Sequence, residues 1–292
     1  MKKIVKVGSR DSRLAVIQAK MVIASIQQSC PDVDVKLVTM SSFGDKNLDR
    51  SIESMGKENL FSDTLESALS YKTIDIAVHS YKDLPINLNK TLPIVALSER
   101  ENPLEALLLR ENCSDNAVIG TSCRRRALQT LKLYPNYTVR DIRGSVPLRL
   151  EKMDKGEFDG LILAVAGLKR LGLDGRISKI FSADEIVPSA CQGIIAVQGR
   201  KNEDYSYLRE FDCNTSHIVS EAELTFVKAM NTDGSAYNNG VYAEICGDNV
   251  KIVGCSIVGG NRIVKSAISG DLSKAKELAA GLAEKFLEDR NQ

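Results

Sequence analysis

Tryptophan is absent from this chain of 292 residues, histidine occurs only twice, and aromatic residues make up 5% of it. With so few imidazole side chains, we expect no histidine-based metal site and no Ser-His-Asp triad away from His79. The seven cysteines are scattered, odd in number and free of CxxC spacing. This pattern is typical of a reducing compartment and argues against a disulfide framework or a zinc site. We therefore predict a cytoplasmic protein without a bound metal.

The chain also lacks a charge bias and long apolar runs. A formal net charge of +1 provides no overall field that would attract nucleic acid or an anionic membrane. The first ten residues lack the apolar core of a signal peptide, and no later stretch is apolar enough to span a bilayer. We predict a monomer without nucleic-acid or membrane partners, in which any anion site comes from local clustering of charge.

Apolar runs and helical periodicity alternate along most of the chain. This alternation predicts parallel or mixed sheets covered by helices, and two crossings between lobes predict a hinge. The last part predicts a small α+β domain. We expect domain 1 at 1–98 and 194–213, domain 2 at 99–193 and a C-terminal domain at 214–292. The expected strands are 4–7, 35–39, 74–78, 92–97, 104–109, 118–120, 138–142, 160–164, 194–197, 241–246, 250–258 and 262–267. Three helices are expected to begin after Ser12, at Cys123 and near Pro147. Four more are expected at 60–71, 165–172, 217–230 and 273–289.

The first strand-to-helix turn contains Arg10 and Ser12, and Ser12 is expected to cap the helix that follows. The helix itself is predicted from apolar residues that recur at helical spacing, which are Leu14, Ile17, Met21 and Ala24.

The stretch AVHSYKDLP follows an apolar strand and ends at Pro85. Open α/β sheets place their ligands in loops at the carboxyl ends of strands, so Ser80, Lys82 and Asp83 are candidate site residues. A carboxylate beside a lysine can act as a general acid or base, or can stabilise a developing cation. The alternative is that Asp83 only shapes the turn, which is a common role of aspartate.

Arginine clusters at two successive strand-to-helix turns of the second half. Thr121 and Ser122 lead into Cys123 and three arginines, and the next turn contains Arg143, with Arg149 on the following helix. Guanidinium groups at a helix amino terminus strengthen an anion site. They also oppose the helix dipole, which costs stability unless an anion binds. Arginine forks pair with carboxylates or phosphates. The pattern indicates an anion site, with a solvated run of charge as the alternative.

Five stretches in this order resemble the porphobilinogen deaminase (hydroxymethylbilane synthase) family over nearly the whole chain. They are GSRDSRLAVIQA, AVHSYKDLP, IGTSCRRRAL, RDIRGSVPLRL and LILAVAGLKRLGL. The resemblance implies an α/β fold with two lobes like type II periplasmic binding proteins and a small α+β C-terminal domain. It also implies a transferase that joins four porphobilinogen molecules head to tail, with loss of ammonia, on a dipyrromethane primer.

By motif match, the resemblance implies a role for each candidate. Asp83 takes the place of the catalytic carboxylate. Primer binding is implied for Arg125 and Arg126, helped by Ser80, Lys82, Thr121 and Ser122. Substrate or chain binding is implied for Arg10, Ser12, Arg143, Arg149 and Arg170.

One departure bears on the primer. The family attaches it to a cysteine, and in this chain Ser235 stands at that position within DGSAYNNG. A serine hydroxyl is a poor nucleophile without a base. Three ways to hold a primer therefore stay open: ion pairs alone, an ether to Ser235, or another thiol, of which Cys123 lies in the primer motif. For Cys123 the alternative is a small, inert side chain at the start of a helix.

Three functions remain. The first is an active deaminase, and the second is a paralogue that binds pyrrole polycarboxylates without turnover. The third, without the family resemblance, is a two-lobed binder of phosphate or nucleic acid. The near-neutral charge and the shortage of aromatic residues argue against the third.

Overall fold

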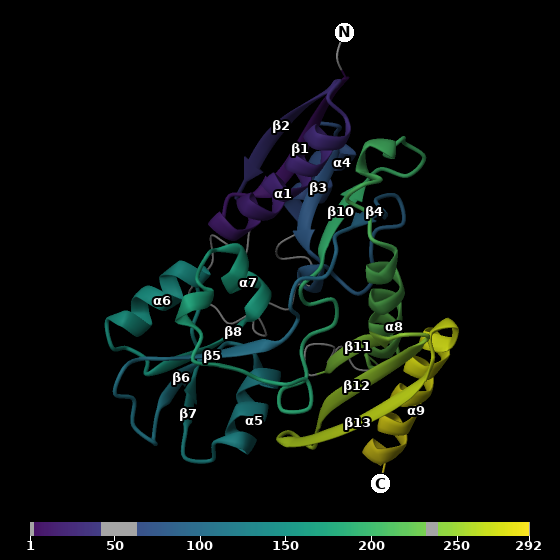
Figure 1. The fold of residues 1–292 in the computed structure, drawn as a ribbon. Helices are drawn as coiled ribbons and strands as arrows, with labels where there is room; N and C mark the ends of the chain where they lie inside the picture. The colour runs from purple at the N-terminus through teal and green to yellow at the C-terminus, as the bar shows by residue number, and fades with distance from the viewer. Residues whose placement is uncertain (1–2, 42–62, 232–238, 292) are drawn as a thin grey trace. The chain divides into compact units, whose positions relative to one another are not determined.

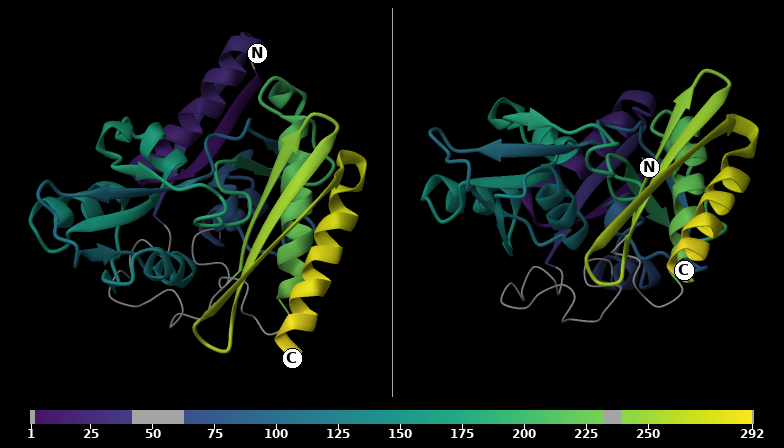
Figure 2. Two further views of the ribbon diagram at one scale, coloured as in Figure 1. Left: turned by 60° about the horizontal axis from the view of Figure 1, so that its bottom comes forward. Right: turned by 90° about the horizontal axis from the view of Figure 1, so that it is seen from below.

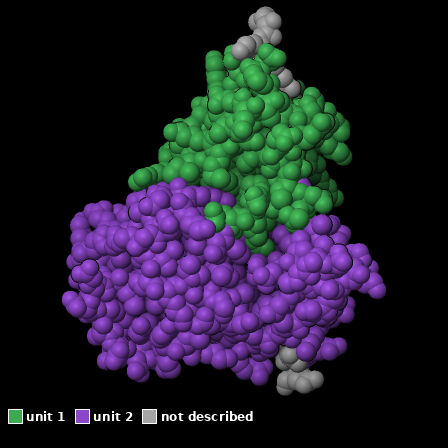
Figure 3. All heavy atoms as spheres, in the orientation of Figure 1, with its two compact units in different colours: residues 1–101, 193–216 green, residues 102–192, 217–292 purple. Residues whose placement is uncertain are grey.

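A computed structural model describes residues 3–41, 63–231 and 239–291 (Figure 1). The chain divides into two compact units, coloured separately in Figure 3. Unit 1 contains Met1–Glu101 and Gly193–Ser216, and unit 2 contains Asn102–Gln192 and His217–Gln292.

Unit 1 is built on a five-stranded mixed sheet in the order β2-β1-β3-β10-β4. Strand β1 pairs in parallel with β2 and β3, whereas β10 is antiparallel to β3 and β4. The expectation that the strand near 194–197 returns to the first sheet is therefore confirmed. The elements are β1 (Lys3–Arg10), α1 (Arg13–Ser29), β2 (Val33–Met40), α4 (Asp63–Ser70), β3 (Ile76–Ser80), the 3-10 turn η1 (Tyr81–Asp83), β4 (Ile94–Leu97), β10 (Ile195–Gly199) and the 3-10 turn η3 (Ser206–Leu208).

Helix α1 covers one face of this sheet. Ser12 caps it as predicted, since its side chain accepts a hydrogen bond from the Ala15 N–H at 3.4 Å. The buried side contains Ala15, Gln18, Ala19, Val22 and Ile26. Of the apolar residues that recur at helical spacing, Met21 is 43% exposed, Ala24 is exposed, and Leu14 and Ile17 are half-buried. The repeat therefore marks the helix but not its buried side.

Unit 2 contains a second five-stranded mixed sheet, in the order β7-β6-β8-β5-β9. Strand β6 is parallel to β7 and β8, and β5 is antiparallel to β8 and β9. The short strand β9 was not expected. The elements are β5 (Glu105–Leu109), β6 (Val118–Gly120), α5 (Arg124–Leu133), β7 (Thr138–Arg140), α6 (Val146–Asp154), β8 (Gly160–Ala164), α7 (Val165–Arg170), the 3-10 turn η2 (Asp174–Arg176) and β9 (Lys179–Ile180).

The C-terminal part of unit 2 is an antiparallel sheet with helices on one face. Phe226 of α8 and Phe286 of α9 meet edge to face, with ring centroids 5.5 Å apart, and both approach Gly254 of β12. Both helices therefore cover the same face of the sheet (Figure 2), and a larger residue at Gly254 would displace them. The elements are α8 (Asn214–Met230), β11 (Gly240–Cys246), β12 (Asn249–Val258), β13 (Arg262–Asp271), the 3-10 turn η5 (Leu272–Lys274) and α9 (Ala275–Asn291).

The predicted fold class is confirmed: the chain is α/β, with two mixed sheets of one topology and a small α+β part. Residues 102–192 and 217–292 belong to one compact unit, so the division of the chain into three domains stays a prediction. Among the described helices, none combines the length and the apolar character needed to cross a bilayer.

Candidate active site

In unit 1, the predicted site residues follow two neighbouring parallel strands. Arg10 ends β1 and Ser80 ends β3. Because these strands pair in parallel, with Gly8 opposite Ala77, both ends lie at one edge of the sheet. The Ser80 hydroxyl is held by Gln18 of α1, at 2.9 and 3.1 Å. Gln18 is a residue that the sequence did not single out.

Asp83 ends the 3-10 turn η1, and its side chain is exposed. The turn is closed by the backbone, through the Leu84 N–H and the Tyr81 carbonyl at 3.1 Å. Among the described residues, none makes a hydrogen bond to the Asp83 carboxylate. The turn therefore does not depend on this carboxylate, which is free to meet a ligand.

His79 lies one residue before Ser80 and is buried. Burial lowers its pKa to about 4, a hydrogen bond with Gln198 partly opposes that shift, and the charge of Arg10 adds to it. The imidazole is therefore neutral near pH 7, and it brings no positive charge to the edge where Arg10 and Lys82 lie.

In unit 2, the arginine motif forms the start of α5. Cys123 is the residue before the helix and makes no side-chain cap. The Cys123 N–H donates to the Thr121 hydroxyl at 3.3 Å, and Thr121 is itself buried. Ser122 and Cys123 are half-buried, and Arg124 is exposed. The conformation of the turn thus comes from Thr121.

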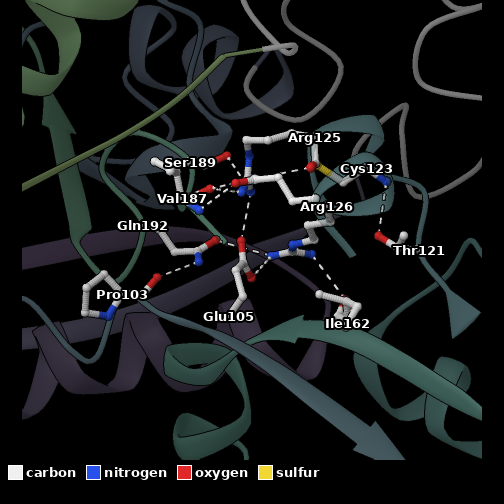
Figure 4. A network of polar contacts seen from close by, with 11 residues as sticks. Pro103, Glu105, Thr121, Cys123, Arg125, Arg126, Ile162, Val187, Ser189 and Gln192 are labelled. Atoms are coloured by element: carbon white, nitrogen blue, oxygen red, sulfur yellow. Dashed lines mark hydrogen bonds and ion pairs between the residues drawn. The ribbon is translucent and has the colours of Figure 1, made fainter. Parts of the chain in front are cut away.

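Arg125 and Arg126 point inward and share one carboxylate (Figure 4). Glu105 of β5, which is fully buried, contacts Arg125 Nη2 through Oε1 and Arg126 Nη2 through Oε2, each at 2.8 Å. We expected three arginines at a helix start to cost stability unless an anion binds. Glu105 meets part of that need from within the chain, because it supplies one countercharge to the two buried arginines.

Carbonyl and amide oxygens complete the network around the arginine pair. Arg125 donates to the Val187 carbonyl and, at 3.5 Å, to the Ser189 hydroxyl. Arg126 donates to Gln192 Oε1 at 3.3 Å and to the Ile162 carbonyl at 3.5 Å. These oxygens fix where both guanidinium groups lie before any ligand arrives.

The charges of the pair act on the neighbouring thiol. Burial raises the pKa of Cys123, but the positive charges of Arg125 and Arg126 and the Arg126 backbone N–H outweigh burial and lower it. The pKa of Arg125 is raised although burial alone would lower it, because Cys123 and Glu105 offer negative charge. Cys255, by contrast, is buried, which raises its pKa to about 11. Cys123 thus has more thiolate character than an ordinary cysteine.

The remaining predicted arginines lie in the same unit. Arg143 follows β7, and its Nη1 is buried without a hydrogen-bond partner among the described residues. Arg149 of α6 donates through Nε to the Gly144 carbonyl at 2.8 Å, and Arg170 ends α7. Strands β6, β7 and β8 are parallel, so Thr121, Arg143 and the start of α7 follow their carboxyl ends at one edge of the sheet. Ser235 lies outside the described residues.

Sequence reasoning missed Glu105, Gln192 and Ser189. For Glu105 a signal existed, since a charged residue at the start of the apolar strand EALLL needs a buried countercharge. The other two lie in a loop, where no periodicity points to a partner.

These observations describe an α/β protein whose arginines gather at the carboxyl ends of parallel strands, where this class of fold offers anion sites. The comparison with known proteins gives the family. The family described as "Porphobilinogen deaminase, dipyromethane cofactor binding domain" matches residues 5–207. The chain therefore belongs to the porphobilinogen deaminase family.

Curated relatives agree with this match. A porphobilinogen deaminase of Acetivibrio thermocellus is 46% identical over 286 residues, with 97% of this chain and 98% of the relative covered. One of Ruminiclostridium cellulolyticum is 44% identical over 291 residues, with 98% of each covered. Among solved structures, the methionine-binding protein MetQ is 14% identical with a TM-score of 0.44, covering 80% of this chain and 95% of that one.

Proposed function

We propose that this chain is an active hydroxymethylbilane synthase, which condenses four porphobilinogen molecules head to tail with loss of ammonia to a linear tetrapyrrole. Membership of the family over nearly the whole chain carries the assignment. The exposed Asp83 carboxylate and the preorganised arginine pair support turnover, because each fits one demand of the reaction.

The first demand is charge. Every ring of the substrate and product carries an acetate and a propionate, so the site must neutralise many carboxylates. We assign substrate and chain binding to residues that bring guanidinium or hydroxyl groups to the strand ends. They are Arg10, Ser12, Arg143, Arg149 and Arg170.

The second demand is a dipyrromethane cofactor, which the matched family domain binds. The residues of α5 fit an anionic group, since the buried Nε atoms of Arg125 and Arg126 have no hydrogen-bond partner among the described residues. When bound, the cofactor supplies the free α-carbon end to which further rings are added. We assign its binding to Ser80, Lys82, Thr121, Ser122, Cys123, Arg125, Arg126 and Ser235.

The third demand is proton transfer. Loss of ammonia from porphobilinogen leaves a cationic methylene-pyrrole, and a carboxylate near the pyrrole N–H groups aids proton transfer and stabilises that cation. Asp83 is assigned this role. Its exposure and its independence from the turn leave the carboxylate available to substrate.

Incubation of the purified protein with porphobilinogen tests the proposal. Release of ammonia with formation of a tetrapyrrole supports it. Saturable binding of porphobilinogen without product would instead assign the chain to the alternative, a paralogue that binds pyrrole polycarboxylates without turnover.

The mode of cofactor attachment has its own test, the intact mass of the denatured protein after expression with porphobilinogen supplied. An added two-ring mass shows a covalent bond, and peptide mapping assigns it to Ser235 or to Cys123. An unchanged mass, with dipyrromethane recovered from the native protein, shows that ion pairs alone hold the group.

We further propose a monomer in the cytoplasm, without nucleic-acid or membrane partners, in three domains at 1–98 with 194–213, 99–193 and 214–292. The free state of all seven cysteines supports a reducing compartment. Light scattering at catalytic concentration tests the monomer.

A further inference from the structure

The arginine pair is held on one side by the loop of residues 187–192. Arg125 donates to the Val187 carbonyl and the Ser189 hydroxyl, and Arg126 donates to Gln192 Oε1. Gln192 also donates from Nε2 to the Pro103 carbonyl at 2.7 Å. The position of this loop therefore decides where three of the acceptors of the pair lie.

The two ends of the loop are fixed by different side chains. At the Val187 end, Gln129 of α5 accepts from the Val187 N–H at 2.9 Å and donates to its carbonyl at 3.3 Å. At the Gln192 end, the Cys191 N–H donates to Glu223 Oε2 of α8 at 2.6 Å. Glu223 thus acts on the end that holds Arg126.

Glu223 also fixes the loop to the C-terminal sheet. Its other oxygen, Oε1, accepts from the Ala243 N–H of β11 at 2.8 Å, and the carboxylate is fully buried. A second link runs beside it, from the Val241 N–H to the Pro188 carbonyl at 3.0 Å. One carboxylate therefore ties the 187–192 loop to β11 through two backbone N–H groups.

The backbone conformation of Cys191 explains why a contact from Glu223 is needed at this point of the loop. Cys191 has a φ of 59° and is 1% exposed. A residue with a Cβ atom adopts this left-handed region only at a cost in free energy, so contacts around it must hold the conformation. A charge-assisted hydrogen bond to the Cys191 N–H is such a contact.

We propose that Glu223 is a positioning residue for the anion site: by holding the 187–192 loop against β11, it keeps Gln192 in place and so orients Arg126 toward the pyrrole carboxylates. The proposal rests on the proposed function for the identity of the ligand. It requires a carboxylate, since two N–H donors need two acceptor oxygens, whereas glutamine would turn an NH2 group toward one of them.

The test is dipyrromethane affinity at equilibrium, measured by calorimetry on protein freed of its own cofactor, where no substrate is present to turn over. Glu223→Gln is expected to raise the Kd about tenfold, the loss typical of one charged hydrogen-bonded contact. Glu221→Gln, on an exposed carboxylate of the same helix, is the matched control and should leave the Kd unchanged. Hydrogen exchange of the 187–192 peptide should quicken only in the first variant.

Two further variants separate positioning from loss of stability. Phe286→Leu loosens the packing of α8 against α9 without touching the loop, and should leave the Kd unchanged even where it lowers the melting temperature as much as Glu223→Gln does. In a Gln192→Leu background, Glu223→Gln should add little to the Kd, because both changes act on the same path.

An unchanged Kd in Glu223→Gln overturns the proposal, and so does an equal rise in Phe286→Leu or full additivity with Gln192→Leu. Failure of the proposed function is distinct, since it appears as wild-type protein that binds porphobilinogen without releasing ammonia while the Glu223 comparison stands. Absence of any binding by the wild-type protein overturns both.

Discussion

The two mixed sheets share a topology, but the carboxylate associated with each sheet differs in burial and in its partners. In unit 1, Asp83 is exposed, and the described residues leave its oxygens without a hydrogen bond. In unit 2, Glu105 is fully buried and holds two arginines at 2.8 Å each. The exposed group can take part in chemistry and contributes little to folding, whereas the buried group sets geometry and is unavailable to ligand. We therefore expect substitution of Asp83 to change the rate of reaction, and substitution of Glu105 to change stability.

The turn before α1 in unit 1 and the turn before α5 in unit 2 also differ. Ser12 in unit 1 caps its helix with its own side chain, and Cys123 in unit 2 does not. A hydroxyl that accepts a hydrogen bond at this position stabilises a helix, whereas the Cys123 thiol makes no such cap. The start of α5, where the arginines lie, therefore lacks the stabilisation that a side-chain cap gives the start of α1.

The largest expected effect concerns chemistry in unit 1. Asp83→Asn should lower the rate of ammonia release about 10²- to 10⁴-fold, because it removes the group that moves a proton in the transition state. The free energy of unfolding should not change, since the backbone closes the turn. Asp32→Asn, on another exposed carboxylate of unit 1, is the control for rate. A variant at position 83 with full activity would remove the carboxylate from the mechanism.

The opposite result is expected for the carboxylate of unit 2. Glu105→Gln removes the carboxylate that two buried arginines share, and should lower the free energy of unfolding by about 3–5 kcal/mol. Urea denaturation measures it. Glu151→Gln, which breaks an exposed ion pair with Lys155 in the same unit, should leave that free energy unchanged. Equal stability of both variants would mean that burial of Glu105 has no energetic role.

Acid should destabilise unit 1 through His79. Its pKa is lowered by burial from 6.5 to about 4 in the folded chain. Between these values the unfolded state binds more protons, so stability is complete above pH 6.5 and is lost as the pH falls toward 4. The free energy of unfolding should drop by about 2 kcal/mol between pH 7.5 and 5. His79→Gln should remove that part of the pH dependence in urea titrations, and an unaltered slope would contradict the shift.

The smallest effect compares the two helix caps. Cys123→Ser should raise the free energy of unfolding by about 1 kcal/mol, because a hydroxyl can accept a hydrogen bond from the first turn of α5. Thermal denaturation checks it. Ser12→Cys in unit 1 is the reciprocal variant and should lower stability by a similar amount. If neither change has an effect, the two turns are energetically equivalent.

Much of this molecule was predictable from local patterns. Strand periodicity and turn residues predicted both sheets, and the glycine after α7 was expected where Gly172 adopts a φ of 68°. Loop position and the clustering of arginines made Asp83 and the arginines candidates, and the family resemblance implied their roles. The spacing of Leu14, Ile17, Met21 and Ala24 predicted α1 but not its buried side, because apolar spacing alone does not show which side packs against a sheet.

By itself, the order of residues determined the alternation of strands and helices, the arginine-rich start of α5 and the acid after β3, because these depend on neighbours within a few positions. Only the tertiary structure decided that Glu105 faces Arg125 and Arg126, and that Glu223 reaches Cys191. Those pairs are separated by at least 20 residues along the chain. Their contacts exist because distant segments exclude water together, and burial then requires each charge to have a partner.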